Sequence, residues 1–87
     1  MISEEKLCTR CGYVYNLEVH HCIHGNGRRK LADEDGLTVY MCHDCHMELH
    51  TNRKIDLEYI MLGQIYYEKR IGTREQFRER YGKSWLK

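Results

Sequence analysis

The sequence contains no proline, one tryptophan and one phenylalanine among its 87 residues. A chain of this length forms one small domain, and a hydrophobic core alone stabilises such a domain only marginally. We therefore expect a second source of stability, for which the five cysteines and six histidines are the candidates. The sequence also has no linker, repeat or low-complexity segment, so residues 1–87 are expected to form a single domain.

Two further absences concern membranes and export. No apolar run approaches the ~20 residues that a membrane-spanning helix needs. The first residues, MISEEKLCTRCG, lack the basic start and the apolar stretch of a signal peptide. We expect a cytoplasmic protein with no membrane partner. In a reducing compartment a CxxC pair more often binds a metal than forms a disulfide, and the odd number of cysteines agrees with this.

The charge is nearly balanced overall but unevenly distributed along the chain. Residues 1–50 carry five Lys and Arg against eight Asp and Glu, a net of −3, whereas residues 51–87 carry nine against five, a net of +4. The formal total of +1 argues against an indiscriminate polycation. A local basic surface can still contact the phosphates of a nucleic acid.

The first half of the chain is predicted to contain two antiparallel strands followed by a helix. The β-branched and aromatic run YVYNLEVHH favours a strand that ends near His21, and the alternating run Leu37–Cys42 favours a second strand. Between the two strands, the polar and glycine-rich segment 24–36 indicates a loop. From His43 the pattern becomes helical.

Residues 51–87 are predicted to form a C-terminal helical extension. The run RKIDLEYIMLGQIYYEKRIG has apolar residues at helical spacing and ends at Gly72. Thr73 and Gln76 then have the spacing of a capping box, and Gly82 stands where a C-terminal cap is expected. Five apolar side chains are expected to pack these helices onto the rest of the domain: Ile60, Met61, Ile65, Phe77 and Trp85.

Four of the five cysteines form two CxxC pairs separated by thirty residues, Cys8 with Cys11 and Cys42 with Cys45. Four thiolates are the ligand set of a tetrahedral structural Zn²⁺, whose binding is coupled to folding. The alternative is that small cysteines merely fill the core. Cys22 is left over, and we expect it to be core packing because the four-cysteine site is complete without it.

The histidines form a second group of candidate ligands. His46 and His50, four residues apart, share one helix face, and His20 can join them if the first strand lies against that helix. Three imidazoles leave at least one metal position open, as in a catalytic site. Adjacent strand residues point to opposite faces, so His20 and His21 cannot both bind one metal unless the strand end is irregular, and one can bind a metal while the other faces a different pocket. The alternative is exposed polar histidines on the helix, and His24 is expected to be solvent-exposed.

The cysteine and histidine motifs together resemble those of a known family. LEVHH, followed by a glycine-rich basic loop and GLTVYMCHDCHMELH, with a flanking CxxC, is similar to the HNH endonucleases, which have the ββα-metal fold. The resemblance covers residues 8–50, and the later run GTREQFRERYGKSWL is similar to the end of small HNH proteins of bacteriophages and prophages. It implies an α+β fold, a small zinc-stabilised ββα-metal (HNH) domain followed by C-terminal helices, and metal-dependent hydrolysis of DNA phosphodiester bonds.

The resemblance also implies roles by position. His20 and His46 would bind a catalytic divalent metal (Mg²⁺, Mn²⁺, Ni²⁺ or Zn²⁺), with His50 as a third ligand or a contact to the scissile phosphate. His21 would be the general base that deprotonates the attacking water, which suits an imidazole with an ordinary pKa of ~6.5. Many family members carry an asparagine just before the second strand that orients the base-bearing loop. Here Asp35-Gly36 stands there, and Asn26 could serve only if the loop backbone folds back, so the orienting role is unassigned.

Arg28, Arg29 and Lys30 lie in the predicted loop and, beside a site that hydrolyses phosphodiesters, are expected to contact the DNA backbone. On their own, three basic residues in a loop indicate only a solvated surface.

The competing function is a non-catalytic zinc module, derived from the HNH fold, that binds DNA or protein. A redox protein that uses CxxC explains none of the histidines. With one active site per chain, double-strand cleavage requires a homodimer or two successive nicks. A larger phage or host complex is also compatible with the sequence.

Overall fold

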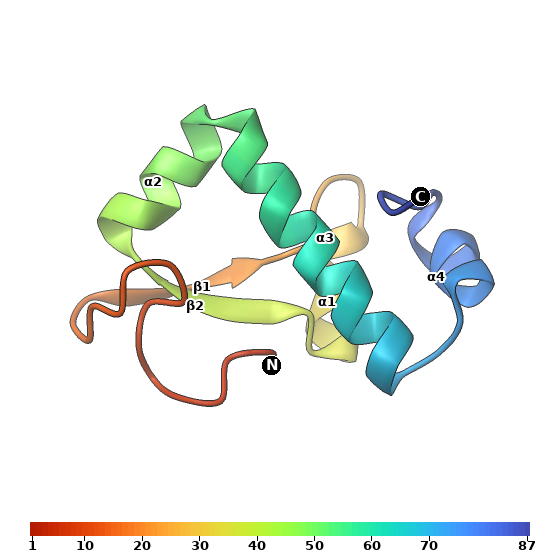
Figure 1. The fold of residues 1–87 in the computed structure, drawn as a ribbon, viewed down its shortest axis with the longest axis horizontal. Helices are drawn as coiled ribbons and strands as arrows, with labels where there is room; N and C mark the ends of the chain where they lie inside the picture. Colours follow the sequence, from red (N-terminus) through yellow and green to blue (C-terminus); the bar gives the residue numbers. More distant parts are fainter.

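A two-stranded antiparallel sheet and four helices make up the computed structural model, which describes all of residues 1–87 (Figure 1). The elements, in chain order, are β1 (Leu17–His21), α1 (Arg28–Asp35), β2 (Thr38–Cys42), α2 (His43–Thr51), α3 (Arg53–Arg70) and α4 (Arg74–Tyr81). This is an α+β protein, as the sequence predicts. No helix in it has the length and apolar character needed to cross a bilayer.

The sheet pairs β1 with β2, with His21 opposite Thr38 at one end of the register. The strand predicted over residues 13–21 forms only in its second half. Asn16 adopts a positive φ of 53°, which interrupts the extended backbone immediately before β1. Residues 13–15 therefore lie outside the sheet, and their side chains are exposed.

The segment between the strands, which the sequence predicts to be a loop, contains helix α1. Gly27 and Gly36 flank this helix with φ values of 79° and 70°, a left-handed conformation that glycine adopts without steric cost. The residues between them are mostly good helix formers, and Ala32 is fully buried. The loop prediction is wrong because these glycines mark the ends of a helix, whereas their abundance suggested irregular structure.

The helices that follow β2 agree with the predicted boundaries. α2 begins at His43, directly after the second strand, and α3 ends just before Gly72. Thr73 and Gln76 form the predicted capping box of α4, with both reciprocal hydrogen bonds present. Gly82 ends α4 with a positive φ of 92°.

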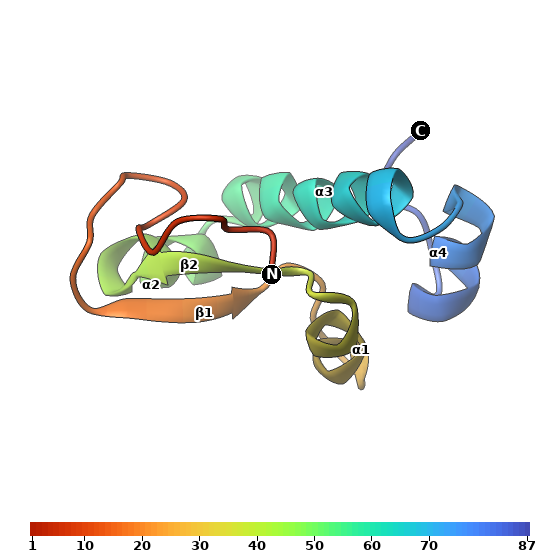
Figure 2. The same ribbon diagram turned by 90° about the horizontal axis from the view of Figure 1, so that it is seen from below.

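The core consists of two clusters that α3 connects. In Figure 2, α3 runs along one side of the sheet towards α4, while α1 lies beyond the other side. The first cluster surrounds the cysteines and contains Cys8, Cys22, Val39, Met41, Cys42, Cys45, Leu49, Ile55 and Tyr59. The second joins α1, α3 and α4 and contains Ile23, Ala32, Leu37, Ile60, Tyr67, Phe77 and Tyr81.

The predicted packing of the C-terminal helices is correct for three of five side chains. Ile60 and Phe77 are buried in the second cluster, and Trp85 packs against it. Met61 and Ile65 are 38% and 39% exposed, which contradicts the prediction. The buried face of α3 includes two polar side chains and runs through Ile55, Asp56, Tyr59, Ile60, Gly63, Gln64 and Tyr67.

Candidate metal centres

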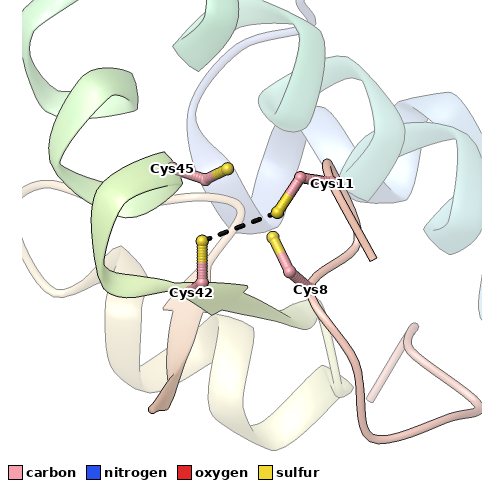
Figure 3. Close-up of side chains that lie close together, drawn as sticks. All are labelled: Cys8, Cys11, Cys42 and Cys45. Carbon is pink, nitrogen blue, oxygen red and sulfur yellow. Dashed lines mark hydrogen bonds between the residues drawn. The ribbon is translucent and has the colours of Figure 1, made fainter. Parts of the chain in front are cut away.

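The four paired cysteines converge on one point (Figure 3). Cys8 and Cys11 come from the N-terminal segment, Cys42 ends β2, and Cys45 lies in the first turn of α2. Their sulfur atoms all lie within 4.8 Å of one another, and the sulfurs of Cys11 and Cys42 are 3.7 Å apart. A tetrahedral zinc with ~2.3 Å bonds to sulfur has sulfur–sulfur edges of about 3.8 Å. The four-cysteine cluster can therefore hold a structural metal such as zinc.

Hydrogen bonds favour the charged form of some of these sulfurs. Burial raises the pKa of the Cys8 thiol, but nearby backbone N–H groups, that of Cys42 above all, outweigh it and lower the pKa to about 6. The Arg10 guanidinium donates to Cys45 Sγ over 3.8 Å and makes two hydrogen bonds to Glu48, of 2.8 and 3.3 Å. Such donors around the sulfurs orient thiolate ligands around a metal.

The fifth cysteine does not join this cluster. Cys22 is fully buried, and its Cβ packs so closely against Gly63 that an added Cβ there would lie only 2.8 Å away. Burial raises the pKa of the Cys22 thiol to about 12, so it stays protonated and is a poor metal ligand. The prediction that Cys22 is core packing is confirmed.

A pocket of about 340 Å³ brings the histidines together. It is lined by Val19, His20, His21, His24, Gly25, Arg29, His46 and His50. His20 and His21 both line it, which the sequence allowed only for an irregular strand end. His21 is the last residue of β1, where the chain leaves the sheet, so the alternation of faces does not continue past it.

The three predicted ligands of a second metal are neighbours in this pocket. His20 Nδ1 lies 3.2 Å from His46 Nε2, and the ring centres of His46 and His50 are 4.7 Å apart. The rings of His20 and His50 are further apart, at 6.2 Å between centres. Unlike the four cysteines, these three side chains do not form a group placed to hold a metal ion in their present positions. Binding one metal would require the imidazoles to rotate.

The environment of His20 suits a neutral ligand. Its residue surface is only 3% exposed, and burial, assisted by the nearby His46, lowers its pKa to about 4. The ring is therefore neutral at pH 7. Its Nε2 atom is buried without a hydrogen-bond partner, an arrangement that costs about 1–3 kcal/mol when nothing compensates it. A metal bound in this pocket would give His20 Nε2 the partner that it lacks.

A carboxylate that the sequence reasoning missed holds His46. Glu18 on β1 accepts hydrogen bonds from His46 Nδ1 at 2.8 Å and from His43 Nδ1 at 3.0 Å. Both bonds lower the pKa of Glu18. A sequence signal for this contact exists, because Glu18 lies two residues before His20 and therefore on the same strand face. With Nδ1 donating to Glu18, His46 keeps the lone pair of Nε2 for a ligand.

Two more carboxylates contact histidines of the pocket. Asp33 Oδ1 lies 2.7 Å from His21 Nε2, and Asp56 Oδ1 lies 2.9 Å from His24 Nε2. Asp56 is buried and also accepts a hydrogen bond from Arg53 at 2.9 Å. His24, expected to be solvent-exposed, has a 41% exposed side chain and also lines the pocket. No local pattern indicates these pairs, whose members are 12 and 32 residues apart.

The three basic residues predicted to contact DNA have different environments. Arg28 donates from Nε to the Tyr81 backbone oxygen at 2.9 Å, and its guanidinium lies 5.4 Å from the centre of the Trp85 ring. It therefore holds the C-terminal segment against α1. Arg29 lines the histidine pocket, and Lys30 is exposed on α1.

Comparison of the chain with protein-family models, with curated proteins and with solved structures finds no match. The resemblance to HNH endonucleases therefore stays a prediction. Any function must be inferred from the geometry of the two centres, the four-cysteine cluster and the histidine pocket.

Proposed function

We propose that this chain is a metal-dependent endonuclease of the HNH type that hydrolyses DNA phosphodiester bonds. Residues 8–50 would form its ββα-metal core around a structural zinc, and residues 51–87 a helical extension. The observation that carries the proposal is the gathering of four histidines from β1 and α2, namely His20, His21, His46 and His50, around one pocket separate from the cysteine cluster. A purely structural zinc domain has no need of this second group.

In this proposal His20 and His46 hold a divalent cation, and His50 is a third ligand or a contact to the scissile phosphate. The buried, unpartnered Nε2 of His20 and the Nε2 of His46, which lies 3.2 Å from His20 Nδ1, fit such a role. When bound, the cation supplies charge stabilisation to the phosphate in the transition state and to the departing 3′ oxygen. His21 would take the proton of the attacking water, the role of a general base.

Positive side chains beside the pocket would hold the DNA backbone. Arg29 lines the histidine pocket itself, and Arg53 lines an adjoining pocket that shares His24 and His50 with it. Contacts of this kind position a strand without reading its sequence. Lys30 is exposed nearby on α1. Because Arg28 contacts the C-terminal segment and Arg53 pairs with Asp56, Arg29 is the main phosphate contact in this proposal.

The nuclease proposal is tested directly by plasmid nicking. We expect the zinc-loaded protein to nick supercoiled DNA when Mg²⁺, Mn²⁺, Ni²⁺ or extra Zn²⁺ is added, and to be inactive in buffer freed of added divalent metal. Native mass spectrometry should find one tightly held zinc and a second, weaker divalent site. One zinc, no second site and no nicking with any of the four metals would instead indicate the non-catalytic zinc module.

Replacement of Glu18 by glutamine should weaken metal binding in the histidine pocket about 10–100-fold, because the carboxylate orients His46 and increases its basicity. Titration calorimetry of Mn²⁺ or Ni²⁺ into the zinc-loaded protein measures this. Asp44→Asn is the matched control, since it removes one exposed carboxylate from the first turn of α2. Equal affinities of Glu18→Gln and wild type would contradict the role of Glu18.

A further inference from the structure

A carboxylate from α1 meets the side chain proposed as the general base. Asp33 Oδ1 lies 2.7 Å from His21 Nε2. Neither side chain makes any other hydrogen bond or ion pair. The His21 side chain is only 16% exposed, whereas that of Asp33 is 64% exposed. The two groups thus form an isolated pair in which a largely enclosed imidazole has one fixed partner.

The helix that carries Asp33 is fastened to the C-terminal helix. Arg80 on α4 donates to Asp35 at 2.6 Å and to Glu34 at 3.1 Å, and the Tyr81 hydroxyl donates to Asp35 at 2.6 Å. The buried Ala32 adds apolar contact with the second core cluster. The apolar contact of Ala32 and the bonds to Glu34 and Asp35 lie on either side of Asp33 along α1. The fold therefore sets the position of Asp33, which does not depend on a mobile loop.

The pairing determines which nitrogen of His21 is available. A neutral imidazole has one N–H group and one lone pair. With a carboxylate at Nε2, the N–H lies on Nε2 and the lone pair lies on Nδ1. We propose, resting on the endonuclease function above, that Asp33 is a positioning residue that fixes His21 in this tautomer and orientation, with Nδ1 as the atom that accepts the proton of water.

Asp33 would fill the orienting role to which the sequence assigns no residue. Asp35-Gly36 stands where many HNH proteins carry the asparagine that orients the base-bearing loop. In this chain the orienting contact comes to the base itself, from a helix between the strands. The alternative is that His21 and Asp33 form only a partly exposed structural ion pair. Such a pair stabilises a fold by about 0–1 kcal/mol and has no effect on a proton transfer.

Kinetics separate these two roles. We expect Asp33→Ala to lower kcat for plasmid nicking about 10–100-fold, with KM and metal affinity within about twofold of wild type. Asp33→Glu keeps a carboxylate at the same helix position and should restore most of the activity. Glu79→Gln is the matched control, since it removes an exposed carboxylate of α4 that takes no part in fastening α1. Nicking by Asp33→Ala at the wild-type rate would overturn the inference.

A second readout does not depend on nuclease activity. Long-range ¹H–¹⁵N correlation spectra of the zinc-loaded protein should show His21 as the Nε2–H tautomer in wild type and a mixture of tautomers in Asp33→Ala. The Nδ1–H tautomer in wild type, or no change in the variant, would overturn the assignment of Asp33. If wild type nicks DNA with none of the four metals, the endonuclease proposal fails, and the spectra still decide whether Asp33 fixes His21.

Discussion

The zinc-loaded His21→Ala variant is expected to nick plasmid DNA about 10²–10⁴-fold more slowly than wild type, the usual contribution of a general base. His21 is the pocket histidine for which Asp33 provides a carboxylate partner, while His20 and His46 contact each other. Loss of His21 would leave the proposed metal ligands in place. The expected result is therefore a protein that still binds both metals but transfers the proton of water poorly.

The measurement combines a nicking time course with metal counting by native mass spectrometry. His43→Ala is the matched control, because His43 has a 62% exposed side chain and does not line the histidine pocket. We expect this control to retain activity close to wild type. A His21→Ala variant that cuts as fast as wild type, with its zinc retained, would show that another group activates the water.

Local patterns were sufficient to predict which cysteines and which helix histidines lie close together. The two CxxC pairs each place two sulfurs together within one turn, so only one long-range pairing was needed to predict the four-cysteine cluster. The same holds for His46 and His50, which a single helix places on one face. These predictions succeed because the spacing along the chain fixes most of the geometry.

The partners of the histidines could not be predicted in this way. The contact between His21 and Asp33 depends on α1, and the glycine-rich composition of that segment concealed the helix. The contact between His24 and Asp56 joins residues 32 positions apart and depends on how α3 packs. Such contacts follow from tertiary structure alone, and they decide which nitrogen of each imidazole is free.

Loss of the cysteine cluster should have the largest effect on stability. Cys42→Ser, or removal of zinc by a strong chelator, is expected to unfold the domain at 25 °C. Structural zinc contributes about 10–16 kcal/mol of apparent binding free energy in small zinc domains, whereas the total stability of a typical domain is about 5–15 kcal/mol. Cys42 ends β2 and precedes α2, so its sulfur joins the N-terminal segment to both elements.

The unfolding should be cooperative, although only the first core cluster contains cysteine. α3 contributes Ile55 and Tyr59 to the first cluster and Ile60 and Tyr67 to the second, so neither cluster can open without disturbing the other. Circular dichroism should therefore lose helix and sheet signal together on chelation and regain both when Zn²⁺ is returned. Cys22→Ala changes a buried cysteine outside the four-sulfur group. Unlike Cys42→Ser, it should keep its zinc and unfold only when denaturant is added. If Cys42→Ser retains zinc and melts as wild type does, the four sulfurs do not form the site on which the fold depends.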